Sequence, residues 1–179
     1  MSNAITLRTL DANAAEAAVP ALADVLIDCV HGGASVSFMA PLPLEKALAF
    51  WQGVADGVAR GERVLLVAED AQGIAGTVQV VLAQPDNQPH RADVAKMLVH
   101  RRARRQGMAA RLLAAAEDAA RAAGKTVLVL DTVTGGDAER LYQRAGWQRV
   151  GTIPNYALMP DGALCSTTYF HRQLAAASP

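Results

Sequence analysis

The feature that most constrains the fold is a strand, a turn and a helix that follow one another between residues 94 and 123. Residues 94–99 are mostly apolar and predict a buried strand. Residues 106–123 are rich in alanine and leucine and predict a helix that Gly124 closes. Arginines and Gly107 fill the turn between them. The N-terminus of a long helix is therefore expected directly after the end of a strand.

Such a turn is suited to bind an anion. The first backbone N–H groups of a helix have no intrahelical partner and lie at the positive end of the helix dipole, so they attract phosphate groups. Gly107 and Ala109 keep bulky side chains away from the backbone that an anion would approach. Alternatively, the glycine only allows a tight connection and the arginines form a solvated surface. The residues of the turn leave both interpretations open.

The hydrophobic pattern of the rest of the chain predicts a mixed sheet with helices packed on its faces. The expected strands are residues 5–8, 63–69, 74–83, 91–99, 127–131, 147–151 and 167–174, and the expected helices are residues 15–30, 44–60, 106–123 and 137–144. Their order fits neither a regular alternation of strands and helices nor an all-β protein. The sequence shows no repeat and no linker, so residues 1–179 are expected to form one domain.

Charge and cysteine content argue against several classes of function. Seventeen basic and seventeen acidic residues give a net charge of zero, so no partner such as nucleic acid or an acidic membrane is expected. No apolar run is long enough to span a bilayer, and acidic residues interrupt the alanine-rich residues 12–30, which also lack a basic start. Cys29 and Cys165 do not make a disulfide framework, so a cytoplasmic location is expected.

Other familiar catalytic patterns are missing from the sequence. The His-Gly-Gly of residues 31–33 is similar to oxyanion-hole loops of α/β-hydrolases, but those enzymes use a G-x-S-x-G elbow that this chain lacks. Serine-esterase chemistry is therefore not expected. The sequence also has no zinc-ligand spacing and no phosphate-loop lysine motif, so no metal is expected.

The spacing Arg104-x-x-Gly107-x-Ala109, five residues after Val99, resembles the acetyl-CoA-binding motif of the GNAT superfamily of N-acetyltransferases. The order of predicted elements is similar to that fold from end to end. The resemblance implies an α+β fold, with a mostly antiparallel central sheet, helices on both faces and a splayed pair of strands. It implies acetyl-CoA as cosubstrate and direct transfer of the acetyl group to an amine. Where the family often has a proline, this chain has Arg101.

The resemblance also implies which residues hold the cofactor. In the family, the strand before the turn splays from its neighbour and pairs free backbone groups with the pantetheine arm, which falls here on Met97, Leu98 and Val99. The backbone N–H of Leu98 is then expected to hold the thioester oxygen. The turn and helix start would hold the pyrophosphate through Arg104, Arg105, Gln106, Gly107, Met108, Ala109 and Ala110, with Arg101 and Arg102 also available.

Residues 138–147 form a second family-like motif, A-x-x-x-Y-x-x-x-G-W. The resemblance implies that Tyr142 is the general acid near the CoA sulfur; the alternative is a tyrosine that packs its ring at the sheet edge. The base is expected to be Asp93 or Asp131, because a carboxylate at a strand end near a cleft accepts an ammonium proton directly or through water, or holds the positive charge. For Asp131 the alternative is a loop cap before Thr132.

One branch of the superfamily, the tabtoxin-resistance acetyltransferases, is similar over residues 30–39, 91–94, 130–132 and 154–162. This resemblance implies a small amino-acid-like amine as acceptor. It also implies an acceptor pocket lined by His31, Ser35, Phe38, Asn155 and Tyr156. A peptide acceptor and a non-catalytic acyl-CoA-binding module are the alternatives. A homodimer that pairs through the last strand is a further expectation.

Overall fold

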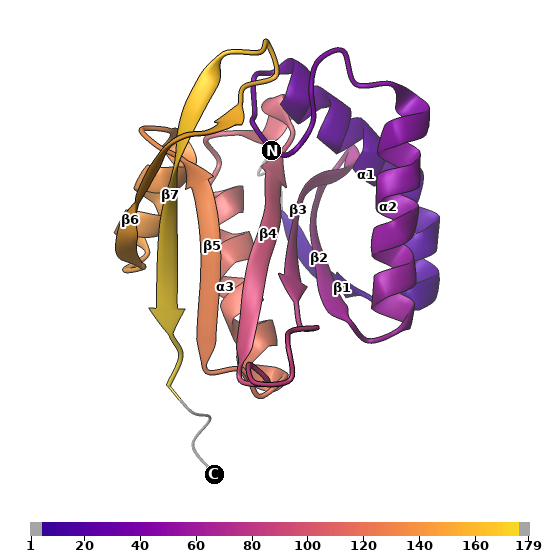
Figure 1. Cartoon of the computed structure of the whole chain (residues 1–179). Coiled ribbons are helices and arrows are strands. Elements are labelled where there is room, and N and C mark those ends of the chain that lie inside the picture. Colours follow the sequence, from indigo (N-terminus) through magenta and orange to yellow (C-terminus); the bar gives the residue numbers. More distant parts are fainter. Residues whose placement is uncertain (1–4, 176–179) are drawn as a thin grey trace.

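The computed structural model describes residues 5–175, which build one seven-stranded sheet with helices on both faces (Figure 1). The elements in chain order are β1 (Thr6–Leu10), α1 (Ala12–His31), α2 (Leu44–Ala59), β2 (Arg63–Asp70), β3 (Gly73–Val81), β4 (Arg91–Val99), a 3₁₀ turn (Arg101–Ala103), α3 (Met108–Ala122), β5 (Val127–Val133), α4 (Asp137–Arg144), β6 (Gln148–Leu158) and β7 (Leu164–Gln173). The predicted order of strands and helices is confirmed.

The strands lie in the order β1-β2-β3-β4-β5-β7-β6, and only the pair β4–β5 is parallel. The mostly antiparallel mixed sheet predicted from the sequence is therefore confirmed. Helices α1 and α2 pack together over the half of the sheet near β1–β4, and α3 covers the opposite face (Figure 1). Within residues 5–175, no helix lies in front of β5, β7 and β6 on the α1/α2 side (Figure 1).

Local signals explain where the first helix begins. The Asp11 side chain accepts a hydrogen bond of 2.8 Å from the N–H of Ala14, so it caps α1 at its N-terminus. Helix α1 consequently starts at Ala12, three residues before the predicted start. Its apolar stripe, which includes Leu22 and Leu26, is buried against the sheet.

The sheet separates two hydrophobic clusters, and β4 changes sides between them. Ala92 and Val94 belong to the cluster under α3, whereas Leu98 belongs to the cluster under α1 and α2. Side chains at even spacing in a strand point to one face, so an extra residue must lie between them. The register shift against β3 and the positive φ of 51° at Lys96 show this β-bulge. After the bulge, Met97 packs toward α3.

Strands β4 and β5 separate soon after they begin. They pair only where residues 91–93 face residues 127–129, although β4 continues to Val99 and β5 to Val133. The predicted splayed pair is therefore present. The opening between the two strands lies beside the turn that leads into α3, which places the strand end and the helix start at one location.

Two expectations about the last strands are wrong. Strand β6 does not end at Gly151 but continues to Leu158, with register shifts on both sides of residues 151–153. Strand β7 pairs with both β5 and β6, so it is an inner strand and cannot offer a free edge to a second subunit. The free edges belong to β1 and β6. Strand β6 is exposed over most of its length and contains Pro154, so its sequence carries no clear alternation.

Two further observations concern partners and covalent links. In the part of the chain that the structure describes, no helix has the length and hydrophobicity needed to cross a membrane. Cys29 and Cys165 are both free thiols; Cys29 is buried in α1 and Cys165 is partly exposed in β7.

Candidate functional site

The turn before α3 has an irregular backbone that exposes N–H groups. Arg105 and Gly107 have φ angles of 61° and 75°, which lie in the left-handed region of backbone conformation. Gly107 is the N-cap residue of α3 and provides no side-chain cap, so the first N–H groups of the helix are not capped by a side chain. Helix α3 starts at Met108 rather than at the predicted residue 106, because the left-handed Gly107 precedes it. These features make a cradle for an anion.

The four arginines of the turn have different roles. The backbone N–H and the Nε of Arg101 each donate to Asp28 at 2.8 Å, and Arg102 forms an ion pair with Asp70 and donates to the Ile74 carbonyl at 3.0 Å. These two arginines therefore hold the turn to the rest of the fold. This corrects the expectation that all four are available for phosphate. Arg104 and Arg105 remain.

Arg104 and Arg105 lie near the start of α4. The hydrogen bond from Arg140 lowers the pKa of Asp137 most, and the charges of Arg105 and Arg104 lower it further. Arg104 also donates from Nε to the Val99 carbonyl at 3.2 Å, which links the turn to the end of β4. Of the two remaining cations, Arg104 thus contacts the end of β4, where the opening between β4 and β5 lies.

The other residues predicted to hold the cofactor offer mainly backbone groups. Gln106 is exposed, and its side-chain amide lies 3.4 Å from the Arg102 carbonyl. The Met108 side chain is only 2% exposed and packs over Gly76 of β3, so only its N–H can face the turn. Ala109 and Ala110 follow it in the first turn of α3, with small side chains.

Strand β4 offers its free backbone groups through alternate residues. The N–H of His100 donates to the Ala75 carbonyl at 2.8 Å, and Leu98 faces the next hydrogen-bonding position on β3. Because backbone groups alternate between the two sides of a strand, the N–H of Leu98 points toward β3 and that of Val99 toward the opening. The expectation that Leu98 holds the thioester oxygen is corrected. Val99, and Met97 on the same side, are the candidates.

Tyr142 reaches this region from α4, with only 4% of its surface exposed. Its ring lies 5.9 Å from that of Trp147 and 6.0 Å from that of Phe170, between ring centroids. Burial, with a smaller contribution from the Asp131 carboxylate, raises the pKa of Tyr142 to about 12. The phenol therefore stays protonated at neutral pH and is suited to donate a proton rather than to accept one.

The two candidate bases differ in their surroundings. Asp93 forms an ion pair with Arg91 and accepts a hydrogen bond of 3.2 Å from Gln84. Asp131 is exposed on β5 and accepts a bond of 3.1 Å from the Thr167 hydroxyl. Within residues 5–175, no basic side chain forms an ion pair with Asp131. Its carboxylate is therefore the freer of the two.

Asp131 lies on the side of the sheet that no helix covers. It faces Tyr169 directly across the β5–β7 pair, so the two side chains lie on the same face. The Tyr169 hydroxyl is 2.9 Å from that of Tyr156 on β6. The bond with Tyr156, then burial and the Asp131 charge, raise the pKa of Tyr169 to about 12. Tyr169 could not be identified from the sequence, because its place opposite Asp131 follows only from the pairing register.

The predicted acceptor residues do not all meet. The Ser35 hydroxyl donates to the Leu158 carbonyl at 2.8 Å and ties the α1–α2 loop to β6, which carries Tyr156. Phe38 packs edge-on against Phe50 of α2, with ring centroids 5.2 Å apart. His31 instead accepts a bond of 3.2 Å from the Leu42 N–H and lines a hollow with Ala40, Met159, Pro160 and Asp161. Its role is thus to hold the loop.

Asn155 lies on β6, next to Tyr156, where the register against β7 shifts between Ile153 and Ala157. Its φ angle of 52° places it in the left-handed region, and it is exposed. Asn155 thus lies on the exposed strand β6, and its role in binding the acceptor stays a prediction.

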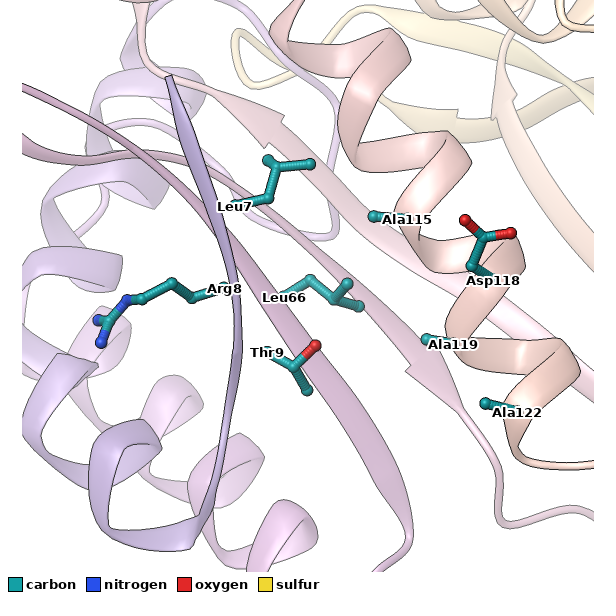
Figure 2. Close-up of a pocket in the computed structure, with 8 residues that line it drawn as sticks. All are labelled: Leu7, Arg8, Thr9, Leu66, Ala115, Asp118, Ala119 and Ala122. Atoms are coloured by element: carbon teal, nitrogen blue, oxygen red, sulfur yellow. The ribbon is translucent and has the colours of Figure 1, made fainter. Parts of the chain in front are cut away.

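A second hollow lies on the α3 side of the sheet, between β1 and α3 (Figure 2). Its walls include Leu7, Leu66 and Ala119, while the Arg8 side chain points away from α3 (Figure 2). Its carboxylate, Asp118, pairs with Arg121 at 2.7 Å. This hollow therefore brings together no reactive groups. In the described part of the chain, no group of three or more His, Cys, Asp or Glu could hold a metal ion.

This chain is similar to known acetyltransferases. Residues 61–149 match the family model described as an acetyltransferase (GNAT) domain. A protein of Azospirillum brasilense, described as an uncharacterized N-acetyltransferase in the hisH-hisA intergenic region, is 37% identical over 112 residues. The match covers 62% of this chain and 65% of that protein, so the chain spans slightly less than two thirds of this curated relative.

Solved structures share the fold over nearly the whole chain. A putative acetyltransferase of Salmonella typhimurium, solved with its cofactor acetyl-CoA, has a TM-score of 0.78 at 21% identity and covers 99% of this chain and 98% of its own. A ribosomal-protein-alanine N-acetyltransferase of Brucella melitensis has a TM-score of 0.79 at 22% identity, covering 94% and 99%. A putative acetyltransferase of Acinetobacter baylyi reaches 0.81 at 13% identity, covering 99% and 97%.

Proposed function

We propose that this chain is an acetyltransferase of the GNAT type, which transfers the acetyl group of acetyl-CoA to the amine of a small molecule. The observation that carries the proposal is the opening between β4 and β5. It begins at the uncapped start of α3 and runs along β4 past the outward N–H of Val99, and Tyr142 and Asp131 are its proposed acid and base. An anion cradle, a free strand edge, an acid and a carboxylate are the parts that acetyl transfer needs.

The residues of the turn fit the charged end of acetyl-CoA. Arg104, Arg105 and the N–H groups at the start of α3 would hold the pyrophosphate, because they combine cations with a helix N-terminus. The outward backbone groups of Met97 and the outward N–H of Val99 would pair with the amide-containing pantetheine arm, since the Val99 carbonyl already accepts from Arg104 and Cys29. The thioester would then lie in the opening, close to Tyr142.

Each reacting group has a residue that serves it. An outward N–H of β4 donates to the carbonyl oxygen of the thioester, where negative charge develops. Asp131 binds the incoming ammonium group and takes up its proton, directly or through water, so that the neutral amine attacks the carbonyl carbon. The new C–N bond forms as the C–S bond breaks, and the Tyr142 hydroxyl donates its proton to the departing sulfur. The extra proton on the new amide nitrogen then passes to the Tyr142 phenolate, which restores the phenol. We favour Asp131 over Asp93 because Arg91 already neutralises Asp93.

Direct transfer fits the state of the cysteine nearest to the cofactor path. The Cys29 thiol donates to the Val99 carbonyl at 3.4 Å, so it lies beside β4. Burial, the largest influence, raises the pKa of Cys29, and the nearby Arg104 only partly offsets it. The group therefore remains a thiol, whereas an acyl-enzyme route would need the thiolate.

The acceptor is proposed to be amino-acid-like. The resemblance of residues 30–39 and 154–162 to the tabtoxin-resistance branch supports this choice. So does the link from Ser35 to Leu158, because it draws the α1–α2 loop against β6, the strand that carries Tyr156.

A coupled assay of CoA release with a panel of free amines tests the proposal. The wild-type protein should consume acetyl-CoA in proportion to an acetylated amine identified by mass spectrometry. Asp131→Asn should lower kcat/KM by roughly 10²–10⁴-fold, the usual contribution of a general base. Asp93→Asn is the matched control and should have a smaller effect. Tight acetyl-CoA binding without turnover of any amine or peptide would instead favour a non-catalytic acyl-CoA-binding module.

A further inference from the structure

Lys96 occupies the bulge of β4, next to the strand end proposed to hold the cofactor. A bulge re-aims the side chain that it carries. The Lys96 ammonium donates to the Ser37 hydroxyl at 3.0 Å and lies 5.7 Å from the centre of the Phe50 ring. Ser37 belongs to the α1–α2 loop and Phe50 to α2, so the charge lies on the α1/α2 side of the sheet. This is also the side on which Asp131 and Tyr169 lie.

The charge of Lys96 is incompletely compensated. Its ammonium group contacts a neutral hydroxyl and an aromatic ring, and within residues 5–175 no carboxylate lies in ion-pair distance of it. Burial lowers the pKa of Lys96, while the Asp131 carboxylate acts in the opposite sense from farther away. A cation withdrawn from water is costly unless it meets an anion, and the ring offsets only part of that cost.

Lys96 and Asp131 therefore place a positive and a negative charge on the same side of the sheet, at the two strands that border the opening. Asp131 is suited to an ammonium group and Lys96 to an anion, so together they complement a molecule with both. We propose that Lys96 binds the carboxylate of the acceptor and makes the enzyme select amino acids over amines that lack a carboxylate. This inference rests on the acetyltransferase function proposed above.

Two other roles for Lys96 make different predictions. If Lys96 only holds the α1–α2 loop through Ser37, its removal should affect all acceptors equally, and Ser37→Ala should act in the same way. If Lys96 is a base, its removal should change the pH dependence of kcat for every acceptor. Only a carboxylate-binding role makes the effect depend on the charge of the acceptor.

Matched pairs of acceptors give the test: free L-amino acids and their carboxamides, assayed with the wild-type protein, Lys96→Met and Lys96→Arg. The measured quantity is the ratio of kcat/KM for the amino acid to that for its amide, which cancels differences in amine basicity when variants are compared. We expect Lys96→Met to lower this ratio by about 10- to 100-fold, the usual effect of a hydrogen bond to a charged group. Lys96→Arg should preserve most of it. The acetyl-CoA affinity and Tm of each variant serve as folding controls.

An equal loss for amino acids and amides in Lys96→Met would overturn the proposal. Wild-type rates for both amino acids and amides in Lys96→Met would also overturn it. If no acceptor in the panel is acetylated although acetyl-CoA binds, the enzymatic function fails separately. The carboxylate site is then read from the thermal shift that each amino acid and amide gives to the CoA complex. The absence of a shift that depends on both the carboxylate and Lys96 would refute it.

Discussion

The chain has two tryptophans, and their indole N–H groups are in opposite states. Trp147 donates from Nε1 to the Glu117 carboxylate at 2.9 Å, while the Nε1 of Trp51 is buried without a hydrogen-bond partner in the part of the chain that the structure describes. Both rings are buried, with 4% and 0% of their surface exposed. Replacing each by phenylalanine removes the same atoms from a core and therefore isolates the value of the hydrogen bond.

Trp147→Phe should be the more destabilising change. It loses a hydrogen bond to a charged acceptor, about 1.5–3 kcal/mol, and leaves a small cavity that costs about 1 kcal/mol more. Glu117 keeps its ion pairs with Arg172 and Arg121, both at 3.5 Å, so the larger cost of an unpaired buried charge does not arise. We expect the free energy of unfolding to fall by about 2.5–4 kcal/mol, which corresponds to a decrease in Tm of about 5–15 °C for a chain of this size.

Trp51→Phe leaves a similar cavity but removes a donor that was already buried without a partner. The relief of that desolvation cost, about 1–3 kcal/mol, should offset most of the cavity cost. Urea unfolding of both variants, with the slope m unchanged, gives the comparison. If the two substitutions cost the same within about 0.5 kcal/mol, the Trp147–Glu117 bond contributes nothing net and the reasoning is refuted.

Three more predictions concern the site and its supports. Tyr142→Phe should lower kcat by roughly 10²–10⁴-fold, and a variant of full activity would exclude the general-acid role. Because the pKa of Tyr142 is about 12, wild-type activity should show no loss from ionisation of this residue up to about pH 10. Arg105→Ala should weaken acetyl-CoA binding about 10- to 100-fold, as measured by calorimetry. Arg101→Ala is the control: because Arg101 pairs with Asp28, this change should mainly lower Tm and alter the acetyl-CoA affinity little. Burial raises the pKa of Asp28, but the bonds from Arg101 and the charge of His100 outweigh it, so the net pKa is lowered. The stability that Asp28 contributes should therefore be present above the unfolded pKa near 3.8 and disappear as the pH falls through the lower folded value. Asp28→Asn should flatten this acid dependence of stability in urea titrations.

Much of the framework follows from the sequence because its signals are local. The apolar residues 91–99 form β4 with the bounds expected, and α4 also begins and ends as predicted. The start of α1 at Ala12 was within reach, because Asp11 is a favourable N-cap residue directly before an alanine-rich run. The full length of β6 could not be predicted, because an exposed edge strand lacks the alternation of apolar and polar residues that marks a half-buried strand.

The site was predictable only in its local parts. The Arg104–Gly107 turn and Tyr142 lie within recognisable motifs, but the contacts of Arg101 with Asp28 join residues far apart in the chain, and nothing in the turn distinguishes Arg101 from Arg105. The pairing of Asp131 with Tyr169 required the strand register. A β-bulge has no strong sequence signal, so the orientation of Lys96 could not be read from the alternation of β4.

The bulge in β4 gives one strand two independent duties. The backbone hydrogen bonds of β4 do not depend on which side chain the strand carries. The side chain at the bulge can therefore be exchanged without altering the hydrogen-bonding pattern around it. If Lys96 binds the acceptor as proposed, substitution at this position would change the accepted molecule and leave the proposed cofactor contacts of the β4 backbone in place. Deleting the bulged residue would have the opposite result, since it would turn Leu98 out of its core and shift every later backbone group by one position.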